Sequence, residues 1–217
     1  MTRSNATILA RAGVCAAACV VLAACSEQEQ AAPQSPLDQA QAEDQAQFQD
    51  QTRTEQADAD TMPAVAIEFV GPDGTKIGDG EVQATAAGVE ITVTVNGLEH
   101  GPHAFHIHET GICEPPDFTS AGGHFDPFGA PHGPPTAGRS ERHAGDMPNE
   151  NAGREGTLKA IVTNELVTLI EGESRLHDPD GSAIVIHAGA DDEHSQPAGA
   201  AGARVACAVV FPPRETG

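Results

Sequence analysis

The sequence of 217 residues contains no tryptophan and no tyrosine, and phenylalanine occurs only seven times. A hydrophobic core must therefore be built mainly from aliphatic side chains. Basic residues are also scarce, because 11 lysines and arginines face 32 aspartates and glutamates, for a formal net charge of −21. Nucleic acids and anionic lipids are bound through basic surfaces, so this composition excludes a broad surface for either.

Long hydrophobic runs are rare, and the first lies at the N-terminus. Residues 12–24 are all small or apolar, follow Arg3 and Arg11, and end before Cys25. This run is shorter than the about 20 residues that a membrane-spanning helix needs, and the pattern is typical of a secretory signal. Leu22-Ala23-Ala24-Cys25 resembles a bacterial lipoprotein box. We expect residues 1–24 to be removed and Cys25 to be lipidated; an ordinary signal peptide cut elsewhere is the alternative.

Residues 25–62 have almost no large apolar residues. Between residues 26 and 62 there are ten glutamines, nine acidic residues and one arginine, Arg53. Such a segment cannot bury enough surface to offset the entropy of ordering it. We expect a lipidated, flexible, acidic tether that holds the following domain in the cell envelope, in the periplasm and on the bacterial outer membrane. A partner-binding segment is the alternative.

From residue 63 onward the pattern favours β-structure, and no helical period of useful length occurs. In residues 81–95, Val89, Ile91, Val93 and Val95 alternate with polar residues, as in a half-buried strand. Further strand-like segments are residues 65–70, 104–108, 157–163, 165–170, 183–188 and 203–211. Residues 110–155 show no convincing strand. We expect residues 63–217 to form one all-β domain, an antiparallel barrel or sandwich of about eight strands with long loops.

Histidine is unusually frequent, with ten residues, and several of the ten lie in metal-binding contexts. His106 and His108 are two apart on a predicted strand, so their rings project from one face and can share a cation. Another histidine ends a strand nearly eighty residues later, and three more lie in the loop that lacks strands. Imidazole suits copper and zinc, and a carboxylate can complete a zinc site. Six histidines and one aspartate suffice for two sites: His106, His108, His124, His132, His143, His187 and Asp146.

Five motifs follow one another between residues 103 and 207: His103-Ala104-Phe105-His106-Ile107-His108-Glu109, Gly122-Gly123-His124-Phe125-Asp126-Pro127, Glu141-Arg142-His143-Ala144-Gly145-Asp146, Val185-Ile186-His187-Ala188-Gly189-Ala190-Asp191-Asp192 and Gly202-Ala203-Arg204-Val205-Ala206-Cys207. In this order they closely resemble the motifs of the copper,zinc superoxide dismutases. The resemblance runs from about residue 64 to residue 211. It implies a Greek-key β-barrel with long metal-binding loops, and it is compatible with a homodimer.

The resemblance also implies a role for each site residue. Copper would be held by His106, His108, His124 and His187, and zinc by His124, His132, His143 and Asp146. His124 would bridge the two metals. Asp191 would link a copper ligand to a zinc ligand, Cys113 and Cys207 would form a disulfide, and Arg204 would attract the anionic substrate, superoxide.

The implied activity is the conversion of two superoxide anions and two protons to dioxygen and hydrogen peroxide. The alternatives are a copper-delivery or metal-binding lipoprotein of the same fold, and a non-catalytic structural domain. Departures from the family pattern are Ala104, where glycine is usual, and an insert at residues 133–140. Four histidines match no ligand position and are expected at the surface: His100, His103, His177 and His194.

Overall fold

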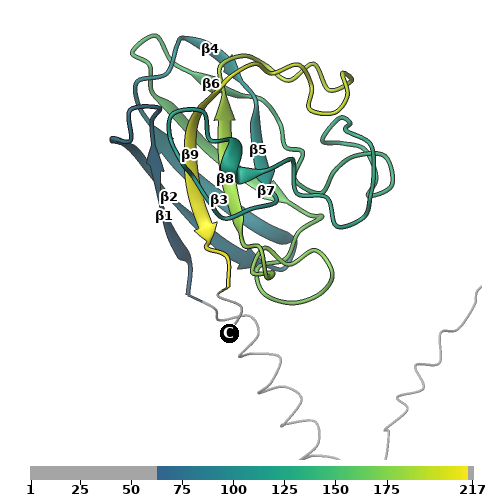
Figure 1. The fold of residues 1–217 in the computed structure, drawn as a ribbon. Coiled ribbons are helices and arrows are strands. Elements are labelled where there is room, and N and C mark those ends of the chain that lie inside the picture. Colours follow the sequence, from purple (N-terminus) through teal and green to yellow (C-terminus); the bar gives the residue numbers. More distant parts are fainter. Residues whose placement is uncertain (1–62, 215–217) are drawn as a thin grey trace, which may run out of the picture. The chain divides into compact units, whose positions relative to one another are not determined.

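The computed structural model describes residues 63–214, which form an all-β domain with nine strands in one antiparallel sheet (Figure 1). The predicted signal peptide, Cys25 and the tether lie outside the described residues. The strands are β1 (Val65–Val70), β2 (Lys76–Thr85), β3 (Gly88–Val95), β4 (Gly101–His103), β5 (Phe105–His108), β6 (Glu150–Ala152), β7 (Leu158–Asn164), β8 (Ser182–His187) and β9 (Arg204–Phe211). Within residues 63–214, no helix has the length and hydrophobicity needed to cross a bilayer.

The sheet curls into a nearly closed barrel. Its strand order is β4-β6-β7-β3-β2-β1-β9-β8-β5, so β4 and β5 lie at opposite edges of the sheet. In the chain, only Ala104 separates these two strands, and the edges must therefore approach each other. Ala104 donates its N–H to Gly189 O at 2.8 Å and accepts from His187 N at 2.9 Å. The predicted antiparallel Greek-key barrel is confirmed, and the methyl group of Ala104 is accommodated in a fully buried position.

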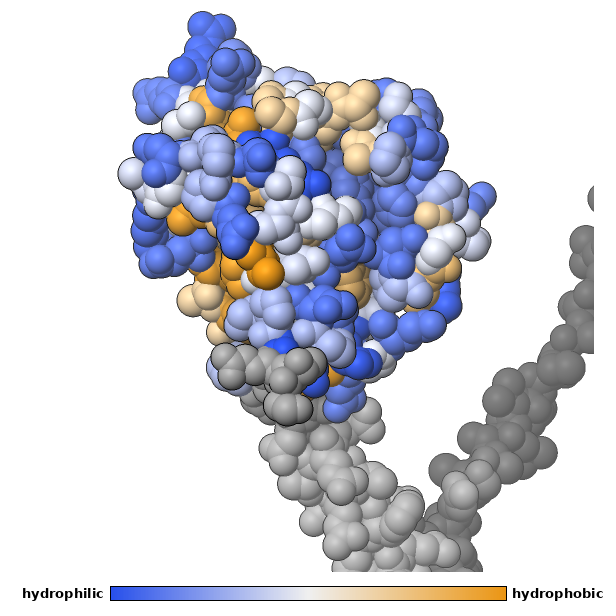
Figure 2. All heavy atoms as spheres, in the orientation of Figure 1, coloured by the Kyte–Doolittle hydropathy of each residue, from blue (hydrophilic) through white to orange (hydrophobic). Residues whose placement is uncertain are grey.

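The core fills the inside of the barrel with side chains from alternating positions. In β7, for example, every second residue from Leu158 is buried, while Ile161 on the outer face is 71% exposed. Strands β5 and β8 are different, because every residue in both is buried. The outer face of these two strands is covered by the loops that carry the metal-binding motifs, and this is where the site lies. The molecular face in Figure 2 is mostly hydrophilic, with smaller hydrophobic areas between.

Four details of the predicted strand pattern are corrected. Residues 81–95 belong to two strands, β2 and β3, rather than one, and β2 begins earlier, at Lys76. Residues 165–170 form no strand; Val167 and Leu169 are apolar because they pack into the core from a loop. Strands β4 and β6 were not predicted, because three residues are too few to show an alternating pattern.

A disulfide joins the long loop after β5 to the middle of the sheet. Cys113 and Cys207 are bonded, their Cα atoms are 5.7 Å apart, and they are separated by 94 positions in the chain. Closing a loop of this length stabilises the folded state by about 4–5 kcal/mol in a chain-entropy description. Cys207 lies on β9, next to β8, so the bond fixes the start of the loop close to the metal-binding strands.

Candidate metal centre

Two paired strands and the loop after the first of them bring four histidines together. His106 and His108 lie on β5, which pairs with β8, and His187 is the last residue of β8. His124 joins them through a single β-bridge to His108. One ring nitrogen from each of the four histidines lies within 4.8 Å of the others. The four predicted copper ligands thus form one buried group, which we call the copper cluster.

The free ring nitrogens of this cluster fit a bound cation. His106 Nδ1, His108 Nε2, His124 Nε2 and His187 Nε2 are buried and have no hydrogen-bond partner. Buried polar atoms are nearly always paired, because an unpaired one loses its hydration without compensation. Four such nitrogens converging on one point satisfy this rule if a metal ion supplies the missing interaction, and imidazole nitrogen is a ligand that copper prefers.

The other ring nitrogen of three of these histidines is fixed by an oxygen acceptor. His106 Nε2 donates to Asp191 Oδ2 at 2.7 Å, and His108 Nδ1 donates to Gly122 O at 3.0 Å. His187 Nδ1 lies 3.2 Å from Gly202 O. Such contacts set the tautomer, since the nitrogen that donates leaves the other nitrogen with its lone pair free for a metal.

The second group, which we call the zinc cluster, is formed by His124, His132, His143 and Asp146. The ring Nδ1 atoms of the three histidines lie 2.7, 3.0 and 3.2 Å from the same atom, Asp146 Oδ1. Ligands about 2.0–2.1 Å from one tetrahedral zinc ion are about 3.3 Å apart. The observed contacts are slightly shorter, so the four groups lie close enough together to hold one zinc ion. His132 Nδ1 is near Asp146 Oδ1 but not in hydrogen-bonding geometry, which also favours a shared cation.

The zinc cluster is held in place by the backbone around it. Asp146 Oδ2 accepts from Gly133 N at 3.1 Å and from His143 N at 2.9 Å. Gly145 lies so close to β5 that a Cβ atom would collide with Ile107 O, and glycine is therefore required there. Arg142, which is buried, donates to Ala137 O and to Asp146 O. This side chain ties the insert at residues 133–140 to the cluster.

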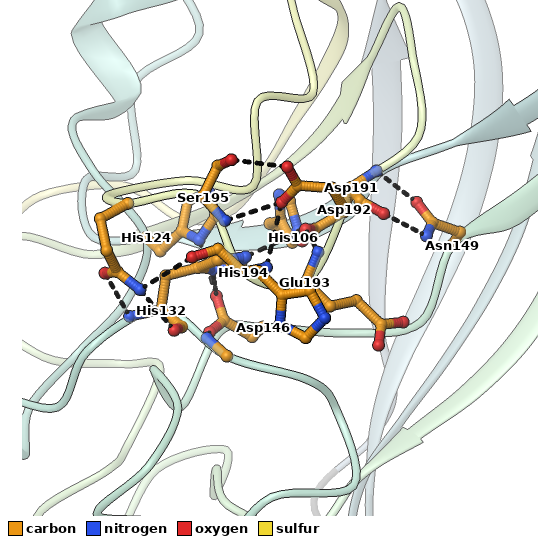
Figure 3. Close-up of polar contacts among 12 residues, drawn as sticks. His106, His124, His132, Asp146, Asn149, Asp191, Asp192, Glu193, His194 and Ser195 are labelled. Carbon is orange, nitrogen blue, oxygen red and sulfur yellow. Dashed lines mark hydrogen bonds and ion pairs between the residues drawn. The ribbon is translucent and has the colours of Figure 1, made fainter.

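Asp191 connects the two clusters through its carboxylate (Figure 3). Its Oδ2 accepts from His106 Nε2 at 2.7 Å and its Oδ1 accepts from His132 Nε2 at 3.0 Å. The adjacent Gly199 has a positive φ of 66°, and a side chain there would collide with this carboxylate. The carboxylate of Asp191 therefore lies between His106 of one cluster and His132 of the other.

Arg204, the first residue of β9, lies beside the copper cluster. Its guanidinium donates to Phe118 O and Gly122 O, each at 2.6 Å. Gly122 O also accepts from the ring of His108, so one carbonyl group connects the guanidinium to a copper-cluster histidine. Burial lowers the pKa of Arg204, and the nearby carboxylates of Asp117 and Glu109 oppose that shift.

Burial favours the neutral ring at three of the copper-cluster histidines, His108, His124 and His187, by lowering their pKa values. It lowers the pKa of His124 to about 4 and that of His187 to about 3, and the positive charge of neighbouring rings adds to the effect at His187. Burial by itself raises the pKa of Asp146 and Asp191. Their contacts with histidines and backbone N–H groups outweigh burial and hold the pKa of both carboxyls below the usual range. Neutral imidazoles and ionised carboxylates are the forms that bind metal.

The four histidines outside the clusters have different surroundings, and one expectation about them is wrong. His103 is buried rather than at the surface, with Nδ1 2.6 Å from His187 O and Nε2 2.8 Å from Glu99 O. His177 stacks on Phe211.

Asn149 is a residue that the sequence analysis did not single out. Its side-chain amide forms hydrogen bonds with both backbone groups of Asp191. A single asparagine in a loop gives no periodic or spacing signal that would reveal this contact.

We predict that the metal-free protein loses stability in acid. His124 and His187 have lowered pKa values of about 4 and about 3, against an ordinary value of 6.5. Below about pH 6.5 the unfolded chain therefore binds protons at these two rings that the folded chain does not bind. The free energy of unfolding should therefore fall as the pH drops from about 6.5 to about 3, by up to about 8 kcal/mol, because each pKa unit between the unfolded and folded values contributes about 1.4 kcal/mol. His143, whose pKa is raised by Asp146 despite burial, opposes this in part.

Chemical denaturation of the metal-free protein at a series of pH values tests this. His187→Ala should flatten the profile, whereas His194→Gln, at an exposed position, should leave its slope unchanged. A stability that is constant between pH 6.5 and pH 4, within error, would contradict the assignment of neutral buried rings.

The comparisons with known proteins all point to the same family. Residues 78–210 match the family model described as copper/zinc superoxide dismutase. A copper-zinc superoxide dismutase of Aquifex aeolicus is 45% identical over 145 residues, which cover 66% of this chain and 84% of that protein. One from Caulobacter vibrioides is 43% identical over 141 residues, covering 64% of this chain and 80% of that protein.

Solved structures agree with these sequences. The crystal structure of a SOD-like protein from Bacillus subtilis has a TM-score of 0.63 at 34% identity, covering 67% of this chain and 97% of that chain. The Cu/Zn superoxide dismutase from Brucella abortus has a TM-score of 0.57 at 25% identity, covering 69% and 100%. The family model spans most of the described domain, and it follows that this chain belongs to the copper/zinc superoxide dismutase family, as an oxidoreductase with copper and zinc as cofactors.

Proposed function

We propose that the chain converts superoxide to dioxygen and hydrogen peroxide at a two-metal site that shares the imidazole of His124. Copper would be held by His106, His108, His124 and His187, and zinc by His124, His132, His143 and Asp146. The observation that carries this proposal is the position of His124. Its Nε2 belongs to the cluster of four histidines, and its Nδ1 belongs to the cluster around Asp146.

Copper, when bound, would supply a one-electron couple that oxidises one superoxide anion and reduces a second, and zinc would polarise the imidazole of His124. The chain must also deliver protons, because peroxide formation consumes two of them. His124 Nε2 is buried and has no protein partner, so whenever it is not bound to a metal it is the ring atom that can pass a proton to the substrate position. Its Nδ1 lies 2.7 Å from Asp146 Oδ1, a contact that orients the ring.

Arg204 is suited to bind the anion. Its two terminal nitrogens are each fixed by a backbone carbonyl group, so the guanidinium is oriented before substrate arrives. Preorganised positive charge at a partly buried position attracts and orients a small anion. A non-catalytic structural domain would need no such group. A metal-delivery protein would also fill the two clusters, but it would not need a fixed cation beside the copper ligands.

We predict that His124→Ala abolishes most of the turnover. A positioned proton donor contributes about 10²–10⁴-fold to a rate, so superoxide consumption per bound copper should fall at least about a hundredfold. Copper and zinc contents are measured on the same samples, and His100→Ala, at an exposed position outside both clusters, serves as the control.

Two results would count against the proposal. Full occupancy by both metals with negligible turnover in the parent protein would favour the metal-delivery alternative. Turnover per copper in His124→Ala equal to that of His100→Ala would remove the role of the shared imidazole.

We predict that Arg204→Ala lowers kcat/KM at least about tenfold, whereas added salt has little effect on the parent protein. The segment 191–203 contains three acidic residues and no lysine. No lysine of this segment therefore adds to the attraction of Arg204 for the anionic substrate. The negative charges of Asp117 and Glu109 further reduce the positive electrostatic potential around Arg204. Raising ionic strength from about 0.01 M to about 0.1 M shortens the screening length from about 30 to about 10 Å and should change the rate less than about twofold. A steep loss of rate with salt would contradict this.

We also propose that the mature chain is anchored to a membrane of the cell envelope by a lipid on Cys25. The support is the sequence alone: a basic start, an apolar run and the box that ends at Cys25. The full chain expressed in a bacterium should partition into the detergent phase. Cys25→Ser should move to the aqueous phase, whereas Cys19→Ser, inside the predicted signal, should behave as the parent. Detergent partitioning of Cys25→Ser would exclude the anchor.

A further inference from the structure

The segment that follows β8 contacts His132 of the zinc cluster through both its ring and its backbone. Asp191, in this segment, contacts the ring of His132 through Nε2 at 3.0 Å. Five residues further on, Gln196 contacts the backbone of the same histidine. His132 therefore receives its ring partner and its peptide partners from one short stretch of chain. Sequence motifs point to Asp191 but give no role to Gln196.

The amide of Gln196 satisfies both backbone groups of His132. Its Oε1 accepts from His132 N at 3.0 Å, and its Nε2 donates to His132 O at 2.8 Å. This pair of bonds has the pattern of one rung between antiparallel strands, although His132 lies in the loop between β5 and β6 and not in a strand. A glutamine amide can do this because it carries an acceptor and two donors on one rigid group.

A second amide makes the matching contact in the other direction. Asn149 lies at the end of the loop between β5 and β6, accepts from Asp191 N at 2.7 Å and donates to Asp191 O at 2.9 Å (Figure 3). Each of the two segments thus supplies an amide that fixes the backbone of a site residue in the other. With the backbone and Nε2 of His132 both fixed, its Nδ1 is aimed at the zinc cluster, 3.0 Å from Asp146 Oδ1.

We propose that Gln196 is a positioning residue for the zinc site, acting through His132 without touching the metal. Partners that orient a metal ligand typically contribute 10–100-fold to affinity. Loss of the amide should therefore weaken zinc binding about tenfold. Copper binding should be unchanged, because Gln196 bonds none of the copper-cluster histidines. The proposal rests on the zinc assignment made above.

The test is Gln196→Met, which keeps the length of the side chain and removes both amide bonds. Zinc affinity is measured by competition with a chelator, and the absorption spectrum of Co²⁺ bound in place of zinc reports the ligand geometry. The matched control is Ser195→Ala in the same segment, since the Ser195 hydroxyl donates only to Asp192. His143→Ala is measured in parallel as a variant of a proposed zinc ligand.

We expect Gln196→Met to weaken zinc binding about tenfold and to alter the Co²⁺ spectrum, with copper affinity and the Ser195→Ala control unchanged. If Gln196→Met binds zinc like the parent while His143→Ala does not, the positioning role is wrong and the zinc site stands. If His143→Ala also binds zinc like the parent, the zinc assignment itself is wrong. Equal loss of copper and zinc affinity in Gln196→Met would show a general structural role and would overturn the proposal.

Discussion

The imidazole of His124 must serve two sets of neighbours at once, and much of the fold serves to keep it between them. One of its nitrogens faces the histidines of β5 and β8, and the other faces Asp146 in the loop between β5 and β6. A loop of that length would normally be free to move. Here its start is fixed to β9 by the Cys113–Cys207 bond. Its later part is fixed through Asp146, and through the hydrogen bond that Ile107 N on β5 donates to Gly145 O.

The site carries an energetic cost that bound metal offsets. Five imidazole nitrogens in the two clusters are buried without a hydrogen bond, and each such atom destabilises a protein that leaves it unpaired. The other ring nitrogens and the Asp191 carboxylate have their partners already, so the rings are oriented before a metal arrives. Metal binding and folding of the loops are therefore thermodynamically linked. The same linkage explains why acid should destabilise the metal-free protein.

Much of this could be predicted from the sequence, because the strongest signals are local. Two histidines separated by one residue on a strand must share a face, and alternating valines and isoleucines identify β3 without a structure. The covering of β5 on both faces could not be predicted, since it depends on where a distant loop folds. The amide contacts of Asn149 and Gln196 were missed for the same reason: a polar residue in a loop has no pattern that names its partner. His103 was misjudged because a buried histidine bonded to two carbonyl groups looks, in sequence, like any other histidine.

The most direct test of the shared imidazole is diffraction from crystals of the copper- and zinc-loaded protein, recorded at the absorption edges of both metals. A shared imidazole requires one copper peak near Nε2 and one zinc peak near Nδ1 of His124, each at about 2 Å from its nitrogen. Two peaks of which only one contacts His124, or a single metal position for both elements, would contradict it.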